Sequence, residues 1–282
     1  MYLDLHTHSS ASDGQYTPSE LVELAKQLNL EVIALTDHDT VAGIREARQR
    51  ATEIGQDFIA GIEISTRESE EIHILGLGID EENEALLSAT GKWMRERTDR
   101  GIVITDYLKS IGVEVDYEEV KELAGFGSVG RPHFAEYLQK HGYVRSRQEA
   151  FDRYIDTPSF HKATDRVLPS PREAISLIHQ AGGKAVLAHP GLLKMGKRWQ
   201  ESLIRKLKAA GLDAIEVYYS KHCKAQARYY LSLAKRLDLE VSAGSDFHGE
   251  KVKPDVKLGM KVEERLVEYR TQTQDRLQTK KL

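Results

Sequence analysis

The stretch LDLHTHSSASDG, residues 3–14, decides how the chain begins to fold. Its two leucines alternate with polar residues that include His6 and His8, and this period of two indicates a strand with one apolar and one polar face. Both histidines therefore share a face, and Asp13 follows in the adjoining loop. The pattern predicts a first strand that delivers part of a metal site.

Outward from this stretch, apolar runs that predict strands alternate with amphipathic stretches that predict helices. TPSE at 17–20 and SPRE at 170–173 each place a hydroxyl, a proline and a glutamate as a capped helix start requires. The further predicted strands are EVIALTDHD (31–39), DFIAGIEIS (57–65), EIHILGLGI (71–79), KAVLAHP (184–190), LDAIEVYYS (212–220) and LEVSAGSDFHG (239–249). This alternation predicts a parallel α/β architecture, most simply a barrel.

The middle of the chain has a different pattern, which divides the sequence into three parts. Residues 82–168 are hydrophilic and helical in pattern, so we expect a small helical insertion domain between two barrel strands. The barrel domain is then 1–81 with 169–262, and 263–282 is predicted to be a polar helix or tail.

Composition excludes several classes of protein. The 282 residues are 40% hydrophobic and 30% charged, which suits a globular fold. The net charge of −4 predicts no extended surface for duplex nucleic acid. A single cysteine, Cys223, allows no internal disulfide. No apolar run approaches the roughly 18 residues of a membrane span, and the N-terminus has no signal-peptide pattern, so we expect a cytoplasmic location without membrane contact.

Histidine and acidic side chains gather where the predicted strands end. In parallel barrels these ends meet at one mouth, where functional residues collect. The nine candidates are His6, His8, Asp13, His38, Glu63, His73, His189, Asp246 and His248. Nine donors exceed the four to six that one ion takes, so they suit two or three divalent metals. Imidazole and carboxylate without thiolate favour Mn²⁺, with Fe²⁺ or Zn²⁺ as alternatives.

Three further residues are candidates for contacts with substrate. In GRPHFA, Arg131 and His133 are expected at a helix N-terminus, which attracts anions, and arginine forms paired hydrogen bonds with phosphate. We therefore predict catalytic and substrate-binding roles for both. His222, near a strand end, is a candidate to line the same site, whereas His141 and His179 on predicted helices are expected at the surface.

Taken together, these motifs resemble the polymerase-and-histidinol-phosphatase (PHP) family. The likeness comprises the first His-x-His, TDHD, the glutamate and histidine of the next strands, the later HP and the final Asp-x-His. DLHTHSSASDG with ALTDHDTVAGI looks most like the subgroup of nucleoside 3',5'-bisphosphate phosphatases and ribonuclease AM proteins. The resemblance implies a distorted (β/α)7 TIM-like barrel with a trinuclear site that is commonly active with Mn²⁺.

The resemblance also implies how the ligands are shared. One metal would be held by His6, His8, Glu63 and Asp246, a second by Glu63, His73 and His189, and a third by Asp13, His38 and His248. Asp13 stands where many family members have histidine, although it matches the subgroup. The implied reaction is hydrolysis of a nucleotide phosphoester by an activated hydroxide, on a nucleoside 3',5'-bisphosphate such as adenosine 3',5'-bisphosphate (pAp), or 5'-3' action on short 5'-phosphorylated RNA.

Three alternatives compete with this interpretation. Histidinol phosphatase activity stays within phosphate chemistry, and the insertion with GRPHFA argues against it. Amidohydrolase barrels cleave C–N bonds and also begin with His-x-His, but TDHD and the final DFH fit them poorly. A non-catalytic metal-binding module is the third, and the complete donor set opposes it.

Overall fold

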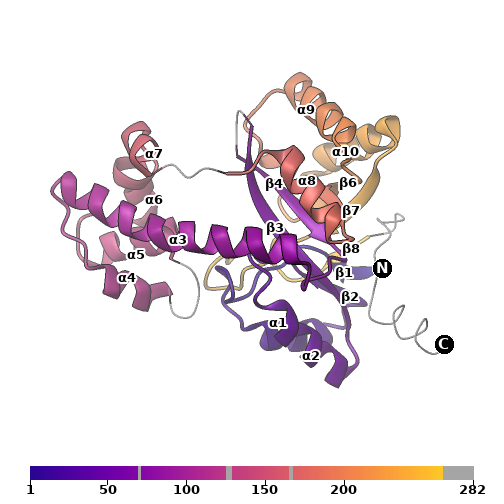
Figure 1. The fold of residues 1–282 in the computed structure, drawn as a ribbon, viewed down its shortest axis with the longest axis horizontal. Coiled ribbons are helices and arrows are strands. Elements are labelled where there is room, and N and C mark those ends of the chain that lie inside the picture. The colour runs from indigo at the N-terminus through magenta and orange to yellow at the C-terminus, as the bar shows by residue number, and fades with distance from the viewer. Residues whose placement is uncertain (69–70, 125–128, 165–167, 263–282) are drawn as a thin grey trace. The chain divides into compact units, whose positions relative to one another are not determined.

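The computed structural model of the chain describes residues 1–68, 71–124, 129–164 and 168–262 (Figure 1). The segment 263–282, predicted as a polar helix or tail, lies outside these residues. The chain forms two compact units, one of Met1–Thr90 with Leu168–Leu282 and one of Gly91–Val167. The division of the chain with an insertion domain of 82–168 stays a prediction.

The first unit is built on an eight-stranded sheet, in the order β7-β6-β5-β4-β3-β2-β1-β8. The strands are β1 (Tyr2–Asp4), β2 (Val32–Leu35), β3 (Asp57–Arg67), β4 (Glu71–Leu77), β5 (Lys184–Leu187), β6 (Ala214–Tyr219), β7 (Glu240–Gly244) and β8 (Met260–Lys261). β1, β2 and β3 run parallel, as do β5, β6 and β7. The predicted α/β barrel is thus confirmed, as a nearly closed barrel.

Among the strands predicted from the sequence, one departs from the parallel arrangement, and the short β8 is also antiparallel to its neighbour β1. β4 is antiparallel to β3 and to β5, with Ser65 opposite His73 and Leu75 opposite Val186. The connection between β3 and β4 spans only residues 68–70, whereas a parallel crossover needs a dozen residues or more. The hairpin therefore turns the amino end of β4 toward the mouth of the barrel.

The barrel closes where the chain beyond β1 meets the chain beyond β7. Leu5 N–H donates to Ala243 O (3.1 Å) and His8 N–H donates to Phe247 O (2.9 Å), while Asp246 N–H donates to the carbonyl of His6 (2.9 Å). The two segments that carry metal-ligand candidates are thereby hydrogen-bonded side by side.

Helices cover the barrel between the strands. They are α1 (Pro18–Gln27), α2 (Ile44–Ile54), α8 (Pro171–Gln180), η2 (Pro190–Leu192), α9 (Lys197–Ala209) and α10 (Lys224–Leu237). The capping boxes predicted at Thr17 and Ser170 are both present, with Glu20 and Glu173 returning the second hydrogen bond. Both helices bury an apolar face, which includes Leu21 in α1 and Ile175 in α8.

The second unit is helical and has a hydrophobic core of its own. Its helices are α3 (Glu84–Ser110, which begins in the first unit), α4 (Tyr117–Ala124), α5 (Arg131–Lys140), α6 (Arg147–Ala150), η1 (Phe151–Ile155) and α7 (Pro158–Thr164). Leu108, Phe134, Leu138 and Phe160 are fully buried in this core. In the part of the chain that the structure describes, no helix has the length and apolar character to cross a membrane.

Gly244 offers a test of barrel closure. A Cβ built on this residue would lie 2.2 Å from the Cβ of His6 and 2.7 Å from Oε1 of Glu216. Gly244→Ala should therefore lower the free energy of unfolding by about 1–3 kcal/mol, the usual cost of overpacking a core, measured by urea denaturation. Gly196→Ala is the matched control, since its Cβ would meet nothing within 4 Å. Equal stability of the two variants would contradict this account of closure.

Candidate metal centre

All nine predicted ligands converge at one end of the barrel. His6, His8 and Asp13 follow β1, His38 follows β2, His189 follows β5, and Asp246 and His248 follow β7. Glu63 and His73 instead lie inside β3 and β4, so their predicted place at strand ends was wrong. The hairpin brings them to the mouth, because the two strands run in opposite directions and Ser65 pairs with His73.

The carboxylate of Glu63 lies at the centre of the cluster and is completely buried. Its Oε2 is 3.2 Å from Nε2 of His6, 3.2 Å from Nε2 of His8 and 3.1 Å from Nδ1 of His38. Its Oε1 is 2.9 Å from Nδ1 of His73 and 3.0 Å from Nε2 of His189. The two oxygens thus face two different groups of imidazoles, as a carboxylate that bridges two ions would.

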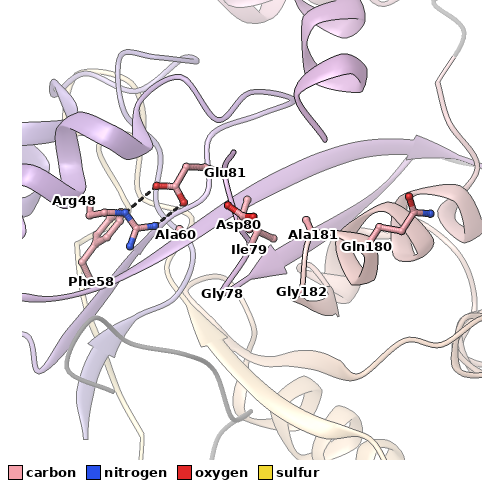
Figure 2. A pocket seen from close by; sticks show the side chains of 10 residues that line it. All are labelled: Arg48, Phe58, Ala60, Gly78, Ile79, Asp80, Glu81, Gln180, Ala181 and Gly182. Carbon is pink, nitrogen blue, oxygen red and sulfur yellow. Dashed lines mark hydrogen bonds and ion pairs between the residues drawn. The ribbon is translucent and has the colours of Figure 1, made fainter. Parts of the chain in front are cut away.

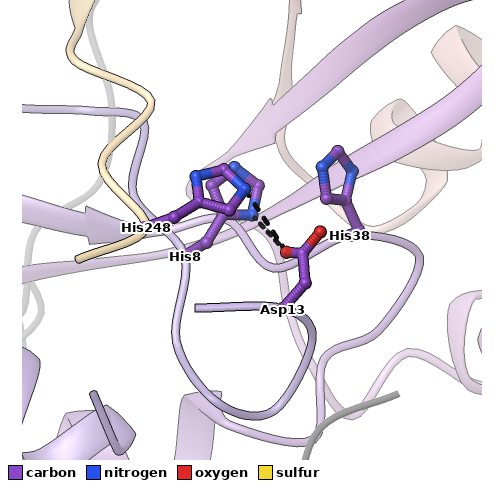
Figure 3. Close-up of side chains that lie close together, drawn as sticks. All are labelled: His8, Asp13, His38 and His248. Atoms are coloured by element: carbon purple, nitrogen blue, oxygen red, sulfur yellow. Dashed lines mark ion pairs between the residues drawn. The ribbon is translucent and has the colours of Figure 1, made fainter. Parts of the chain in front are cut away.

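Two further groupings lie beside Glu63. Asp246 Oδ1 is 3.3 Å from Nε2 of His8 and completes one set with His6 and Glu63. Asp13 Oδ1 is 3.3 Å from Nε2 of His248 and 3.8 Å from Nδ1 of His8 (Figure 3). These residues and His38 form a second set whose ligand atoms lie within 4.8 Å of one another.

The donor set fits divalent metal ions on an observation independent of any family. Among the described residues, Nε2 of His6, both ring nitrogens of His8 and Oε2 of Glu63 are buried and make no hydrogen bond of normal geometry, although Oε2 lies at ion-pair distance from both histidines. Buried polar atoms are otherwise nearly always hydrogen-bonded, because an unmet partner is costly. Binding of metal ions would satisfy these atoms together, and four further histidines and two aspartates lie beside them to complete the coordination.

The ionisation of the cluster also suits metal binding. Burial alone would raise the pKa of Glu63, but the surrounding histidines, with His38 and His6 foremost, hold it well below its usual range. Burial opposes protonation of His8, yet its contacts with Asp246 and Glu63 raise its pKa to about 9. Since a ligating imidazole must be neutral, metal loading at neutral pH displaces protons from this cluster.

A buried carboxylate behind the cluster orients two of the ligands. Nδ1 of His6 donates to Oε1 of Glu216 (3.0 Å), and the backbone N–H of His189 donates to Oε2 (2.7 Å). Such a contact fixes which ring nitrogen of His6 faces the metal position. Sequence reasoning missed Glu216, although a single carboxylate inside the apolar run AIEVYY was a signal.

Three more buried aspartates hold the loops that carry ligands. Asp4 accepts from the backbone N–H of His6, Ser245 and Gly259, although burial raises its pKa to about 6. Asp37 accepts from the backbone and hydroxyl of Ser9. Asp39 accepts from the backbone and hydroxyl of Ser65, two residues after Glu63. None of the three was singled out from sequence, although two of them flank His38 in TDHD.

Two ligand candidates have a backbone conformation that is uncommon without glycine. His189 has φ of 27° and Asp246 has φ of 60°. Such conformations cost free energy and gather at functional sites. Surrounding contacts hold Asp246 in place, because its Oδ2 accepts from the hydroxyl of Tyr219 (3.1 Å) and from Nζ of Lys253 (2.7 Å). Oδ1 is left to face the histidines.

Arg131 and His133 lie in the second unit, at the start of α5 as predicted. Arg131 donates to Oδ1 of Asp156 (2.8 Å), and its guanidinium carbon lies 5.9 Å from the centre of the Phe151 ring. Nδ1 of His133 accepts the backbone N–H of Gly130 (3.0 Å), which caps the helix. Contact of either residue with substrate stays a prediction.

The other histidines have structural partners. Nε2 of His222 accepts the N–H of Gly191 (3.0 Å) and its Nδ1 donates to the carbonyl of Val217 (2.9 Å), so the ring joins the loops after β5 and β6. Its predicted substrate contact stays a prediction. His141 and His179 are exposed and pair with carboxylates, Glu119 and Asp213 respectively, as expected of surface residues.

A cavity of about 410 Å³ lies away from this cluster, among the connections at the other end of β3 and β4 (Figure 2). Arg48 in its wall makes two hydrogen bonds to Glu81, of 2.8 and 2.6 Å. None of the nine ligand candidates lines the cavity, and the guanidinium of Arg48 is already matched by a carboxylate. This cavity therefore offers none of the donors of the histidine cluster.

Comparison with known proteins identifies the family of the chain. The family model described as PHP domain matches residues 4–157. A 5'-3' exoribonuclease of Haemophilus influenzae is 41% identical over 248 residues, covering 87% of this chain and 89% of the relative. A 3',5'-nucleoside bisphosphate phosphatase of Chromobacterium violaceum is 34% identical over 248 residues, covering 87% of each.

A solved structure shares the fold. It is a protein from Chromobacterium violaceum that is described as an amidohydrolase with bound sulfate and no metal. It has a TM-score of 0.81 and 32% identity, covering 92% of this chain and 91% of its own. The barrel and its histidine–carboxylate cluster define a metal-dependent hydrolase of phosphoester bonds. The chain belongs to the PHP domain family.

The role of Glu216 can be tested through metal affinity. Glu216 accepts from Nδ1 of His6 and from the backbone N–H of His189. In Glu216→Gln the amide oxygen can accept from one of these donors, and the amide N–H₂ then faces the other. We expect affinity for the metal to fall about 10–100-fold, measured by titration against a chelator. Glu240→Gln is the control, because Glu240 begins β7 at the end away from Asp246 and His248. This variant should bind the metal as the wild type does. Unchanged affinity in Glu216→Gln would refute the orienting role.

Proposed function

We propose that this protein hydrolyses the 3'-phosphoester of a nucleotide that carries a 5'-phosphate. In pAp that bond holds a terminal phosphate, and in 5'-phosphorylated RNA the same bond joins the first nucleotide to the second. The observation that carries the proposal is the buried carboxylate of Glu63 between two groups of imidazoles. Relatives named for both reactions share 41% and 34% identity with the chain.

Two or three divalent ions, with Mn²⁺ as our proposal, would supply charge neutralisation and an activated water when bound. His6, His8, Glu63 and Asp246 would hold one ion, Glu63, His73 and His189 a second, and Asp13, His38 and His248 a third. Asp13 is the most exposed of the carboxylates, with a side chain 27% accessible. We therefore propose that the third position exchanges its ion most readily.

The residues of the chain have separate tasks in this proposal. Glu216 and Lys253 hold His6 and Asp246 in orientation, so that the ligands need little rearrangement during the reaction. Arg131 would donate to the substrate phosphate, exchanging its bond to Asp156 for one to the anion. His133 would supply the proton that the leaving 3'-oxygen takes up. A nucleotide or RNA substrate suits the predicted cytoplasmic location.

Two other reactions compete with this one. Histidinol phosphate offers a phosphomonoester without a nucleotide, so the pocket around the leaving group decides between them. Hydrolysis of a C–N bond is favoured by the description of the solved relative as an amidohydrolase. A barrel whose histidines serve only to bind metal is opposed by the relatives that are named as enzymes.

One assay separates these reactions. We expect the Mn²⁺-loaded protein to release phosphate from pAp and nucleotides from short 5'-phosphorylated RNA, with little release from histidinol phosphate. Asp246→Ala should lower kcat by about 100-fold or more, since it removes a group that positions charge at the reaction centre. Phosphate release is followed colorimetrically and bound metal by elemental analysis.

The control variant keeps the fold and leaves the cluster intact. Asp213→Asn, whose carboxylate pairs with His179 and Lys184 and accepts the backbone N–H of Ala185, lies outside the cluster and should retain full activity. If no phosphoester is cleaved while less than one ion is bound per chain, the proposed function fails. If Asp246→Ala keeps wild-type activity, the assignment of the site fails instead.

A further inference from the structure

Six cationic side chains lie in the loops that follow β5 and β6 and in the first turns of α9 and α10, and the reaction described above does not use them. They are Lys194, Lys197, Arg198, Lys221, Lys224 and Arg228, called here the cationic rim, and all are exposed. Resting on the proposed function, we propose that the cationic rim binds the single-stranded RNA that continues in the 3' direction from the nucleotide being removed.

The topology of the barrel places the rim at the same end as the metal ligands. The loop with Lys194 begins directly after His189 and leads into α9, and the loop with Lys221 follows β6 and leads into α10. Both helices therefore begin at the carboxyl ends of their strands, which is the mouth of the barrel. α9 and α10 lie side by side on the first unit (Figure 1).

Hydrogen bonds hold the two loops that carry part of the rim. Nε2 of Gln200 donates to the carbonyls of Leu193 and Met195, on either side of Lys194, at 3.0 Å each. The buried hydroxyl of Tyr230 in α10 donates to Oε1 of Gln200 (2.8 Å). His222 further joins the two loops through its bond to Gly191. The cations are thus presented by loops with few degrees of freedom.

A second contact joins the two helices into one surface. Nζ of Lys197 lies 5.1 Å from the centre of the Tyr229 ring, and the hydroxyl of Tyr229 donates to the carbonyl of Lys197 (3.2 Å). Lys224 and Arg228 are four residues apart and so share a face of α10. Tyr229 and Trp199 are partly exposed among the cations, which is the combination of charge and aromatic rings on which single strands stack.

The cations of these two helices differ in whether a carboxylate pairs with them. Within the described residues no carboxylate forms an ion pair with a cation of the rim. By contrast, Arg205 and Arg236 both pair with Glu201, and Lys206 pairs with Glu68. The chain as a whole has a net charge of −4. The rim therefore carries positive charge that no ion pair offsets, and such charge favours a polyanion.

The substrate that this surface fits is an RNA strand longer than one nucleotide. A nucleoside bisphosphate carries all of its phosphates on the nucleotide being cleaved, so it has none to place along the loops and helices. A 5'-phosphorylated strand continues past the cleaved bond with one phosphate per nucleotide. Contacts between those phosphates and the rim would release counterions and make binding sensitive to salt.

The test compares two variants with the same change of charge. The rim variant combines Arg198→Gln, Lys224→Gln and Arg228→Gln. The control variant combines Arg205→Gln, Lys206→Gln and Arg236→Gln, which removes cations of the same helices that are already paired. Each is assayed with Mn²⁺ on pAp and on a 5'-phosphorylated single-stranded RNA of about 12 nucleotides, a length within the usual range of single-strand sites.

We expect the rim variant to raise KM for the RNA at least about tenfold at low salt. The slope of log KM against log salt should fall by about 2, or roughly 0.7 for each phosphate that is no longer neutralised. Its kcat/KM for pAp and both constants of the control variant should stay at wild-type values. An equal decrease of kcat/KM on pAp, or an equal effect of the control variant on RNA, would overturn the proposal.

Fluorescence anisotropy with a non-cleavable phosphorothioate RNA keeps this proposal separate from the proposed function. If the wild type binds this RNA and the rim variant does not, the rim is supported even where no substrate is cleaved. If the wild type cleaves RNA and both variants bind it equally, the proposed function stands and the rim falls. Equal affinity for a blunt duplex of the same length would overturn the preference for a single strand.

Discussion

The structure depends on one buried carboxylate surrounded by imidazoles. Glu63 is fully removed from solvent, and five histidines lie within 3.2 Å of its two oxygens. An isolated buried charge is too costly to persist, so Glu63 requires either protonated histidines or metal ions around it. Residues that follow β1, β2 and β5, or that lie within β3 and β4, contribute to that environment, so the centre depends on the folded barrel.

The carboxylates behind the ligands explain how so polar a centre is tolerated. Glu216, Asp4, Asp37 and Asp39 are all buried, and each accepts hydrogen bonds from a ligand or from the loop beside one. They limit the orientations open to the histidines before any ion arrives. Preorganised sites of this kind lose little free energy to rearrangement when charge develops in a reaction. In the same way, Tyr219 and Lys253 donate to Oδ2 of Asp246 and hold this ligand in place.

The sequence was informative where a local pattern had a local cause. The TPSE helix start depends on neighbouring residues and appears in the structure as predicted. The first strand was also found, but it ends at Asp4, two residues before His6. The antiparallel direction of β4 was harder to predict. The direction of a strand depends on the length of the connection before it and not on its pattern of apolar residues. Glu216 lies 210 residues from His6 in sequence, so only the folded barrel reveals their contact. The substrate contacts predicted for Arg131 and His133 depend on a ligand, and stay predictions.

The most direct test of the central claim is a crystal structure of the protein loaded with Mn²⁺, with anomalous scattering recorded near the manganese absorption edge. The account predicts at least two ions that share Glu63, one on the side of His6 and one on the side of His73, roughly 3.5–4 Å apart. Manganese bound only at positions that do not touch Glu63, or a single ion with Glu63 still paired to protonated histidines at full loading, would contradict it.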